Sequence, residues 1–369
     1  MCLSKNQFSG IIPSSFSNLT KLKMLRLQSN FLEGEIPLEL GDLHYMTFLD
    51  LSFNQLTGSI PSSIYNISRM ETIDLTYNNL TGKLPTTIYG IIPPNIKKCR
   101  KLQLLSLSEN DFTGTIPRKL AHLTALTELY LGGLHLEGTY KSFPRFFFSS
   151  KLVFIYFPLL TGEIPAELGN LKKLWYLGLD INNFTGSVPA SIFNMSLLQI
   201  LSLRENRLSG TLPSDLGDGM PSLEELYCGS NNMSGFISAS ISNSSRLRIL
   251  DLTFNSFTGP IPESLGNLKY LEFLNLGKNN FVGDSALSFL TSLTKCRKLK
   301  AVSFAYNPLD GVFPASVGNF SDSLQSFEGH SCKLKGIIPE EIGNLTKVIK
   351  MNLYNNELTG DIPNTVQAC

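Results

Sequence analysis

Residues 1–13 read MCLSKNQFSGIIP, and the spacing of apolar residues, asparagine, glycine and proline in this stretch recurs along the whole chain. With the asparagine as a mark, the pattern occurs fifteen times, and ten of the fourteen intervals are 24 residues long. The marks are Asn6, Asn30, Asn54, Asn78, Asn110, Leu134, Pro158, Asn182, Asn206, Asn231, Asn255, Asn279, Asn307, Cys332 and Asn356. Such a regular repeat predicts a solenoid, in which each turn packs only on its neighbours.

Each position of the repeat has a physical role. The L-x-L run before each mark alternates apolar and polar residues, which predicts a strand with one buried face. One strand per turn gives a parallel sheet whose strands lie about 4.8 Å apart. The return path is bulkier, so we expect the stack to curve with the sheet on its concave side. The asparagine can satisfy buried backbone groups, glycine allows positive φ, and proline suits the convex return.

Composition argues against several classes of protein. The 369 residues carry 31 basic and 30 acidic side chains, a net charge of +1, so nothing favours nucleic acid or an anionic membrane as a partner. Six scattered cysteines and four histidines have no metal-ligand or catalytic spacing. The most apolar run, residues 146–160, is shorter than the roughly 20 residues of a spanning helix. We expect no catalysis, no cofactor and no metal, and no membrane anchor within these residues.

The repeat resembles the plant-type leucine-rich repeat, whose hallmark is the LxGxIP segment, over essentially all 369 residues. Two segments, SFLTSLTKCRKL (288–299) and GIIPEEIGNLTKV (336–348), look like the receptor-kinase subfamily that includes the flagellin and elongation-factor sensors. The resemblance implies an α/β solenoid of about fifteen repeats: a right-handed superhelix with a concave parallel sheet and short 3₁₀ helices on the convex side.

We expect one solenoid domain over residues 1–369 with three irregular segments. The 32-residue interval after Asn78 predicts a lost strand and a convex bulge at 83–92. Residues 139–158 keep the repeat spacing but lose the IP motif, as in a degenerate repeat or an aromatic patch. Four extra residues at 284–296 predict a convex helix. Since the paired-cysteine caps typical of the family are missing, we expect the chain to be truncated at both ends.

The cysteines are explained by packing. Cys99, Cys296 and Cys369 occupy a repeat slot that leucine holds in other turns, so we expect buried, unreactive thiols. Cys332 stands at a mark, where a thiol replaces part of what asparagine does. Cys2 is expected to be exposed.

The outward strand positions are the candidate ligand-binding surface. They lie six, four, two and one residues before each mark, and several carry aromatic side chains amid polar ones, as protein and peptide interfaces do. The alternative is that these aromatics pack on one another across strands. The candidates are Phe48, Asp50, Phe53, Asp74, Tyr77, Tyr176, Asp180, Arg204, Glu205, Tyr227, Asp251, Phe254, Phe273 and Lys278.

The strand columns hold more acids than bases. The acids are Asp50, Asp74, Glu109, Glu128, Asp180, Glu205, Glu225, Asp251 and Glu328, against Lys5, Arg26, Arg204, Lys278 and Lys350. This predicts that the groove steers a basic or neutral extended peptide. Related receptors that read a peptide carboxylate use an Arg-x-Arg pair on one strand, and no strand here has that pair.

Nine Asn-x-Ser/Thr sequons fall where the repeat should be exposed, six on the convex side and three directly after a mark. They are Asn18, Asn66, Asn79, Asn183, Asn194, Asn232, Asn243, Asn319 and Asn344. We expect glycosylation there and hence a protein of the secretory pathway.

Together these features predict a non-catalytic extracellular recognition module that binds a peptide or protein on its concave face. By resemblance it would be part of a plant receptor-like kinase in immune or developmental signalling, on the outer side of the plasma membrane, with a co-receptor kinase ectodomain as a second partner. A receptor-like protein without a kinase, a secreted inhibitor of polygalacturonase and a non-functional gene fragment remain alternatives.

Overall fold

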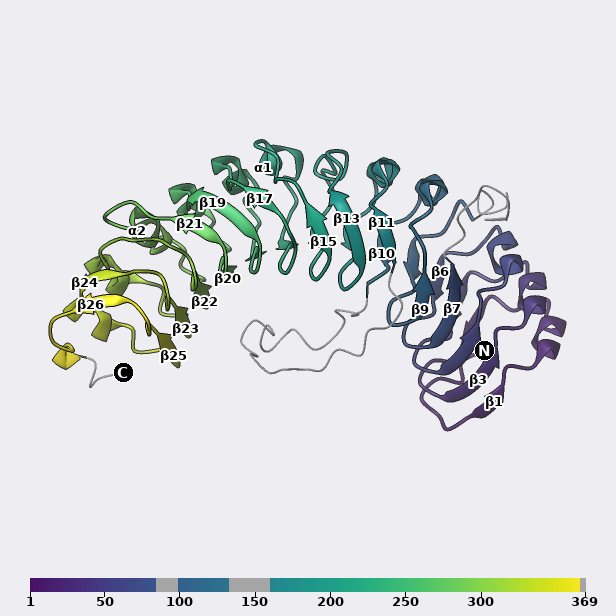
Figure 1. The fold of residues 1–369 in the computed structure, drawn as a ribbon. Coiled ribbons are helices and arrows are strands. Elements are labelled where there is room, and N and C mark those ends of the chain that lie inside the picture. The colour runs from purple at the N-terminus through teal and green to yellow at the C-terminus, as the bar shows by residue number, and fades with distance from the viewer. Residues whose placement is uncertain (84–98, 133–159, 366–369) are drawn as a thin grey trace. The chain divides into compact units, whose positions relative to one another are not determined.

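The computed structural model describes residues 1–83, 99–132 and 160–365 (Figure 1). Its contacts divide the chain into two compact units, Met1–Ile192 and Phe193–Cys369, which are treated separately below. The expected bulge at 84–92 and the irregular stretch at 139–158 lie outside the described residues. The single-domain prediction stays a prediction.

The first unit contains the predicted parallel sheet, here called the inner sheet. Its strands follow one another in chain order. They are β2 (Met24–Arg26), β4 (Phe48–Asp50), β6 (Thr72–Asp74), β8 (Leu104–Ser106), β10 (Glu128–Tyr130) and β12 (Tyr176–Gly178). Equivalent residues pair, such as Leu49 with Leu25 and Ile73. Leu49 and Leu51 are fully buried, so the alternation in sequence becomes one core face and one outward face.

Short parallel strands also follow the marks, which the sequence did not predict. In the first unit β1 (Ser9–Ile11), β3 (Phe31–Glu35), β5 (Gln55–Gly58), β7 (Asn79–Lys83) and β9 (Asp111–Thr113) form one sheet, and β11 (Thr161–Glu163) and β13 (Asn183–Ser187) belong to another. Gly34, in the middle of β3, adopts φ +76°. The glycine allows this positive φ, as expected, and it lies within a short strand that pairs with both neighbours.

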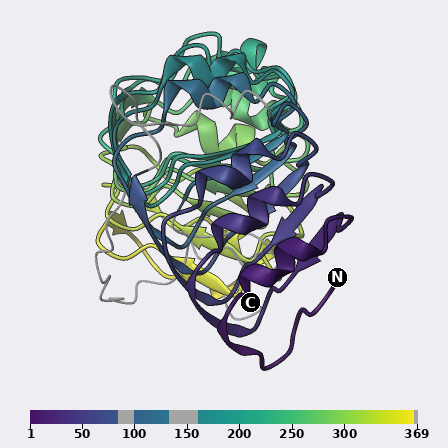
Figure 2. The same ribbon diagram turned by 90° about the vertical axis from the view of Figure 1, so that its right-hand side faces the viewer.

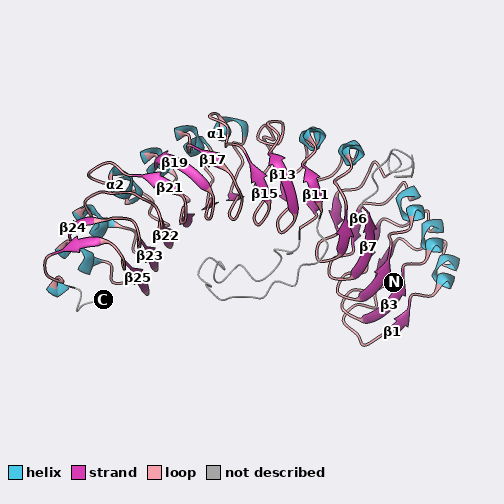
Figure 3. Ribbon diagram, in the orientation of Figure 1, coloured by secondary structure: helices cyan, strands magenta, loops and turns pink. Residues whose placement is uncertain are grey.

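Short helices lie on the side away from the inner sheet in most of the described turns, as Figure 3 shows in cyan and Figure 2 shows for the N-terminal turns, whereas residues 190–194 form turns without a helix. In the first unit they are the 3₁₀ helices η1 (Ser14–Asn18), η2 (Leu38–Asp42), η3 (Ser62–Asn66), η5 (Arg118–His122) and η7 (Ala166–Asn170). Each follows a proline with φ near −65°, such as Pro37 before η2 and Pro165 before η7. The 3₁₀ prediction is confirmed.

The second unit repeats this plan. Its inner sheet holds β14 (Ile200–Ser202), β16 (Glu225–Tyr227), β18 (Ile249–Asp251), β20 (Phe273–Asn275), β22 (Ala301–Ser303), β23 (Ser326–Glu328) and β25 (Lys350–Asn352). The strands after the marks are β15 (Arg207–Ser209), β17 (Ser234–Gly235), β19 (Ser256–Pro260), β21 (Asn280–Val282), β24 (Lys335–Ile337) and β26 (Glu357–Thr359). The helices are α1 (Leu216–Gly219), η8 (Ala239–Asn243), η9 (Glu263–Asn267), α2 (Ser288–Leu293), η10 (Ala315–Asn319) and η11 (Glu340–Asn344).

The asparagine marks form the expected hydrogen-bonded ladder. Asn54 accepts the N–H of Leu32 at 3.1 Å through Oδ1. Its Nδ2 donates to the carbonyls of Leu27, Leu51 and Ser52 at 3.0–3.2 Å. One side chain therefore satisfies four backbone groups from two turns, where no water could reach them.

The residue before each mark is left-handed in every turn that the structure describes. Phe53, Tyr77, Phe254, Lys278 and Tyr306 have φ between 52° and 55°. Left-handed backbone is unfavourable for residues other than glycine, because Cβ crowds a carbonyl oxygen. The ladder bonds that follow hold this conformation, which turns the asparagine inward and leaves the preceding side chain on the outer surface of the sheet.

Cys332 shows what the ladder loses without an asparagine. Its thiol still donates to the carbonyls of Phe304 and His330, both at 3.2 Å. It supplies no acceptor for the N–H of Leu309, which bonds to the carbonyl of Asn307 instead. No strand forms at 308–312 in the described chain, and Asp310 becomes left-handed.

The remaining irregularities agree with the expectations after Asn78 and at 284–296, but not at the mark Pro158, where a strand of its own was expected. β6 pairs directly with β8, so the long interval after Asn78 contributes a single strand to the inner sheet. β10 likewise pairs directly with β12, so no strand for the mark at Pro158 lies between them. The predicted convex helix at 284–296 forms as α2. Cys99 and Cys296 are fully buried, and burial raises the pKa of each thiol to about 11. Cys369 lies outside the described residues.

Candidate functional site

The second unit carries a continuous row of ring and amine side chains across the outward face of its inner sheet. We call Phe254, Lys278, Tyr306, His330 and Tyr354 the aromatic band. Phe254, Tyr306 and Tyr354 are each 43–53% exposed, although large aromatic side chains usually avoid water. The first three members occupy the left-handed position of three successive turns, which is why their side chains stand side by side.

Contacts within the aromatic band link all five members. The Nζ of Lys278 lies 4.0 Å from the ring centroid of Phe254 and 5.1 Å from that of Tyr306. His330 meets Tyr306 edge-on at 4.9 Å and stacks on Tyr354 at 4.5 Å. The hydroxyls of Tyr306 and Tyr354 share a hydrogen bond of 2.7 Å. These contacts preorganise the rings, which lowers the conformational entropy lost on binding.

The charge environment of the aromatic band is uneven. Lys278 forms no ion pair with any described residue, and its ammonium is held only by the two rings. Glu328 pairs with Lys350 at 2.5 Å and lies 3.5 Å from Nδ1 of His330. Burial lowers the pKa of His330 below its ordinary value. The histidine therefore stacks as a neutral ring at neutral pH, and Lys278 is the exposed charge of the aromatic band.

The edge of the same sheet carries a compensated row of charges. Nε of Arg248 donates to Glu272 at 3.1 Å, and Arg248 also lies 3.7 Å from Glu225. Lys300 pairs with Glu272 at 2.6 Å. Glu225 additionally accepts the hydroxyl of Tyr227 at 2.9 Å. These side chains lock neighbouring turns together, and the paired acids contribute less to the surface potential than their number in the sequence suggests.

The remaining candidates in the second unit fall into two groups. Arg204 and Glu205 pair with each other at 2.5 Å, partly exposed. Phe273 is half-buried. Tyr227 and Asp251 are only 8% and 3% exposed, so they were wrongly expected to face solvent. Asp251 accepts the hydroxyl and N–H of Thr253, and burial raises its pKa.

The first unit presents a smaller group of outward side chains. Phe53 and Tyr77 stack at 4.7 Å and are 49% and 41% exposed. Arg26 lies 4.4 Å above the ring of Phe48. The aligned acids Asp50 and Asp74 sit opposite each other on β4 and β6, as expected. Asp50 is only 6% exposed and accepts two bonds from Ser52, and burial raises its pKa.

Two further candidates of the first unit are buried. Tyr176 is 4% exposed, packed 4.2 Å from Tyr130 and edge-on to Trp175. Asp180 is also 4% exposed. Here the alternative of aromatics packing across strands describes the structure better than an exposed binding surface does. Glu109 is half-buried, with Oε1 buried and lacking a hydrogen bond, and burial raises its pKa to about 7.

Sequence reasoning missed Tyr306, His330 and Tyr354, three of the five members of the aromatic band. A signal was present, because Tyr306 and Tyr354 stand one and two residues before their marks, in columns already identified. The contacts among these three side chains were not predictable from the sequence. They depend on how side chains from neighbouring turns of unequal length fit together.

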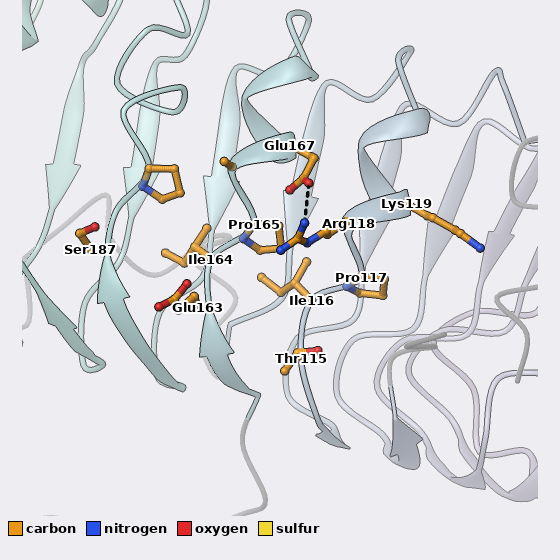
Figure 4. Close-up of a pocket in the computed structure, with 12 residues that line it drawn as sticks. Thr115, Ile116, Pro117, Arg118, Lys119, Glu163, Ile164, Pro165, Glu167 and Ser187 are labelled. Atoms are coloured by element: carbon orange, nitrogen blue, oxygen red, sulfur yellow. Dashed lines mark ion pairs between the residues drawn. The ribbon is translucent and has the colours of Figure 1, made fainter. Parts of the chain in front are cut away.

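A hollow of about 800 Å³ lies on the helix side of the first unit, lined by residues such as Ile116, Pro117, Ile164 and Pro165 (Figure 4). Arg118 crosses it to Glu167 at 3.3 Å. This is an exposed ion pair between neighbouring turns, and the lining has no nucleophile beside a base. Among the described residues, no group of three or more His, Cys, Asp or Glu could hold a metal ion, and no helix is long and apolar enough to cross a membrane.

The predicted glycosylation sites can be placed on the surface. Asn66 and Asn183 are half-buried. The seven exposed sites are Asn18, Asn79, Asn194, Asn232, Asn243, Asn319 and Asn344.

Comparison with known proteins gives consistent matches. Leucine-rich-repeat family models match residues 1–56, 69–99, 101–123, 197–218 and 246–268. The LRR receptor-like serine/threonine-protein kinase EFR of Arabidopsis thaliana is 34% identical over 79 residues, 21% of this chain and 8% of that protein. Receptor kinase-like protein Xa21 of Oryza sativa subsp. japonica is 39% identical over 67 residues, 18% of this chain and 6% of that protein. The matches thus span less than a tenth of either relative.

Solved structures match over almost the whole chain. The ectodomain of the Arabidopsis thaliana receptor kinase GASSHO1/SCHENGEN3, in complex with CASPARIAN STRIP INTEGRITY FACTOR 2, is 32% identical with a TM-score of 0.78. The alignment covers 98% of this chain and 42% of that one. The Arabidopsis receptor kinase HAESA, with the peptide hormone IDA and the co-receptor SERK1, is 26% identical with a TM-score of 0.53, covering 99% and 67%.

Proposed function

Because this chain is a leucine-rich-repeat protein homologous to plant receptor kinases, we propose that it is an extracellular recognition module that binds a peptide on its inner sheet. The aromatic band is the observation that carries this proposal. Exposed, preorganised rings around one cation are typical anchors of protein interfaces. Relatives of this fold hold peptide ligands in solved complexes. Immune or developmental signalling, and assembly with a co-receptor ectodomain, belong to the same proposal.

The aromatic band also suggests the chemistry of the ligand. Apolar or aromatic side chains would pack against Phe254, Tyr306 and Tyr354, and a carboxylate or carbonyl would meet the Nζ of Lys278. The peptide is extended, since an open face of parallel strands offers a long track and no deep pocket. The expectation of steering by acids stays a prediction, since Asp50 is only 6% exposed and Asp74 beside it is half-buried. Any steering of this kind weakens with added salt.

Selection from a displayed random peptide library tests this function. Selected peptides should bind the wild-type chain and lose at least about tenfold in affinity for Tyr306→Ser/Tyr354→Ser, since hot-spot aromatics contribute about 2 kcal/mol or more. Phe236→Ser is the matched control, because Phe236 is a 65% exposed aromatic of the same unit outside the aromatic band. Peptides that bind the double variant as tightly as wild type would overturn the aromatic-band site.

A further inference from the structure

Basic side chains cluster on the surface of the second unit, at the turns that lead into three strands of its inner sheet. Arg246, Lys269, Arg297 and Lys298 lie in the turns just before β18, β20 and β22, and all four are exposed. We call them the basic corner. The three strands pair in register. The N–H of Glu272 donates to the carbonyl of Arg248, and the N–H of Lys300 donates to the carbonyl of Glu272, both at 2.8 Å. These bonds place the three turns side by side.

One acid, Asp322, occupies the equivalent position of the next turn, but it forms no ion pair with the basic corner among the described residues. None of the four bases of the corner forms an ion pair within the described chain. The nearest acids on the strands are already engaged, since Glu272 binds Arg248 and Lys300. The equivalent turns on either side are not basic, being Pro221–Ser222 and Asp322–Ser323. Within the second unit the four bases thus stand in three successive turns bounded by turns without a base, and Lys347 is the further base at the equivalent position, two turns on.

An exposed aromatic residue stands among these cations. Tyr270 is 49% exposed, and the Nζ of Lys298 lies 4.5 Å from its ring centroid. Tyrosine and arginine are enriched where protein interfaces concentrate their binding energy. Guanidinium groups also bind carboxylates through two parallel hydrogen bonds. Four charges around a tyrosine suit a compact acidic protein surface better than a long polyanion, which usually engages more cations.

We propose that the basic corner is the docking surface for a protein partner with an acidic face. The corner belongs to the same three turns as Phe254, Lys278 and Tyr306. Lys278 follows Tyr270 by eight positions, which limits their backbone separation to about 28 Å. One partner could therefore touch both the corner and a ligand on the aromatic band. Docking at the corner does not depend on the proposed peptide binding.

The test uses a fluorescein-labelled 16-residue peptide of Glu, Asp and Tyr as an acidic protein probe. Wild type should bind it with an affinity that falls as salt rises from 25 to 150 mM. Arg246→Glu/Arg297→Glu/Lys298→Glu should lose at least about tenfold in affinity. Lys5→Glu/Lys119→Glu/Lys333→Glu changes the net charge equally at exposed positions elsewhere and should stay within about twofold of wild type.

Three outcomes would overturn this proposal. The first is equal loss in both triple variants, which would mean attraction by net charge alone. The second is corner-dependent binding of sodium polygalacturonate, or of phosphatidylserine vesicles, as tight as that of the peptide. The third is no binding of the acidic peptide at 25 mM salt by folded wild type. Arg246→Gln/Arg297→Gln/Lys298→Gln replaces the Glu variant if thermal unfolding shows that variant to be unstable. Peptides selected on the aromatic band should bind these variants normally, which separates failure here from failure of the proposed function.

Discussion

At the scale of single residues, one side chain per turn holds together the backbone of two turns. Asn255 accepts the N–H of Met233 at 2.9 Å and donates to the carbonyls of Cys228, Leu252 and Thr253 at 2.9–3.2 Å. Asn255 is half-buried, so water can replace these bonds only in part. Removing the Asn255 side chain would leave several partly buried backbone groups without hydrogen-bond partners at once.

We therefore expect Asn255→Ala to reduce the free energy of unfolding by about 3 kcal/mol or more, since each unsatisfied buried group costs about 1–3 kcal/mol. Chemical denaturation monitored by circular dichroism measures this loss. Asn267→Ala is the matched control, because Asn267 is exposed at the end of η9. Similar destabilisation by both variants would contradict the role assigned to the ladder.

Glu109 predicts a pH dependence of stability. Burial raises its folded pKa from 4.5 to about 7. Between these values the unfolded chain has released a proton that the folded chain still holds, so stability falls as pH rises through this window. The loss is complete above about pH 7. Because Glu109 is partly exposed, we expect solvent screening to limit the loss to about 1 kcal/mol.

Thermal unfolding of Glu109→Gln between pH 4 and 8 measures this effect. The variant should gain stability relative to wild type as pH rises from 4.5 to 7 and keep that gain above pH 7. Glu33→Gln, at an exposed position of β3, is the control. An identical pH profile for wild type and Glu109→Gln would show that this carboxyl does not contribute.

At the scale of elements, α2 shows how an insertion is accommodated without breaking the stack. Leu287 takes a left-handed conformation at φ 48° and starts the helix. Phe289 is 4% exposed and meets Phe304 edge-on at 5.6 Å. Four additional residues therefore add buried apolar surface on the convex side, and β20 and β22 still pair in register.

Phe289→Ala should lower the free energy of unfolding by about 3–4 kcal/mol, through lost burial and the cavity left behind. Urea denaturation measures the change, and Lys295→Ala at an exposed position just after α2 is the control. A loss below 1 kcal/mol would mean that α2 is not anchored on the core in solution.

The sequence predicted the inner strands, the ladder and α2 because each depends on residues at fixed spacing within one turn. It did not predict β3, because Gly34 in a five-residue strand looks like a turn. It also misjudged Tyr176, which packs against Tyr130 across paired strands. The aromatic band was found in part, through Phe254 and Lys278. Contacts such as that of His330 with Tyr354 depend on the fit of side chains from different turns, and spacing alone does not encode that fit.

At the scale of the whole molecule, each unit is a chain of nearest-neighbour contacts, so its turns should be separable. Deleting residues 256–279 removes one 24-residue turn and joins Asn255 to the following strand segment. We expect this variant to unfold cooperatively with unchanged circular dichroism per residue. It brings Phe254 next to Tyr306 and removes Lys278, so peptides selected on the aromatic band should lose affinity.

Deleting only residues 256–267 should behave differently. This half-turn deletion removes β19 and η9, so the remaining residues cannot complete a turn between β18 and β20, and we expect loss of cooperative unfolding. Both variants are compared by thermal unfolding and by binding of the selected peptides. A full-turn deletion that fails to fold would show that coupling in the second unit extends beyond adjacent turns.

The left-handed conformation of the residue before each asparagine limits which side chains can be introduced at this outward position of the inner sheet. Valine and threonine suffer there from their branched Cβ, whereas asparagine and serine tolerate the conformation better. The side chains at this position are therefore mostly unbranched at Cβ: lysine, tyrosine, phenylalanine, glutamate, serine and asparagine occur there, and Ile181 is the β-branched exception among the described turns. Substitutions that change binding specificity at these positions can replace one flexible or aromatic side chain by another without disturbing the fold.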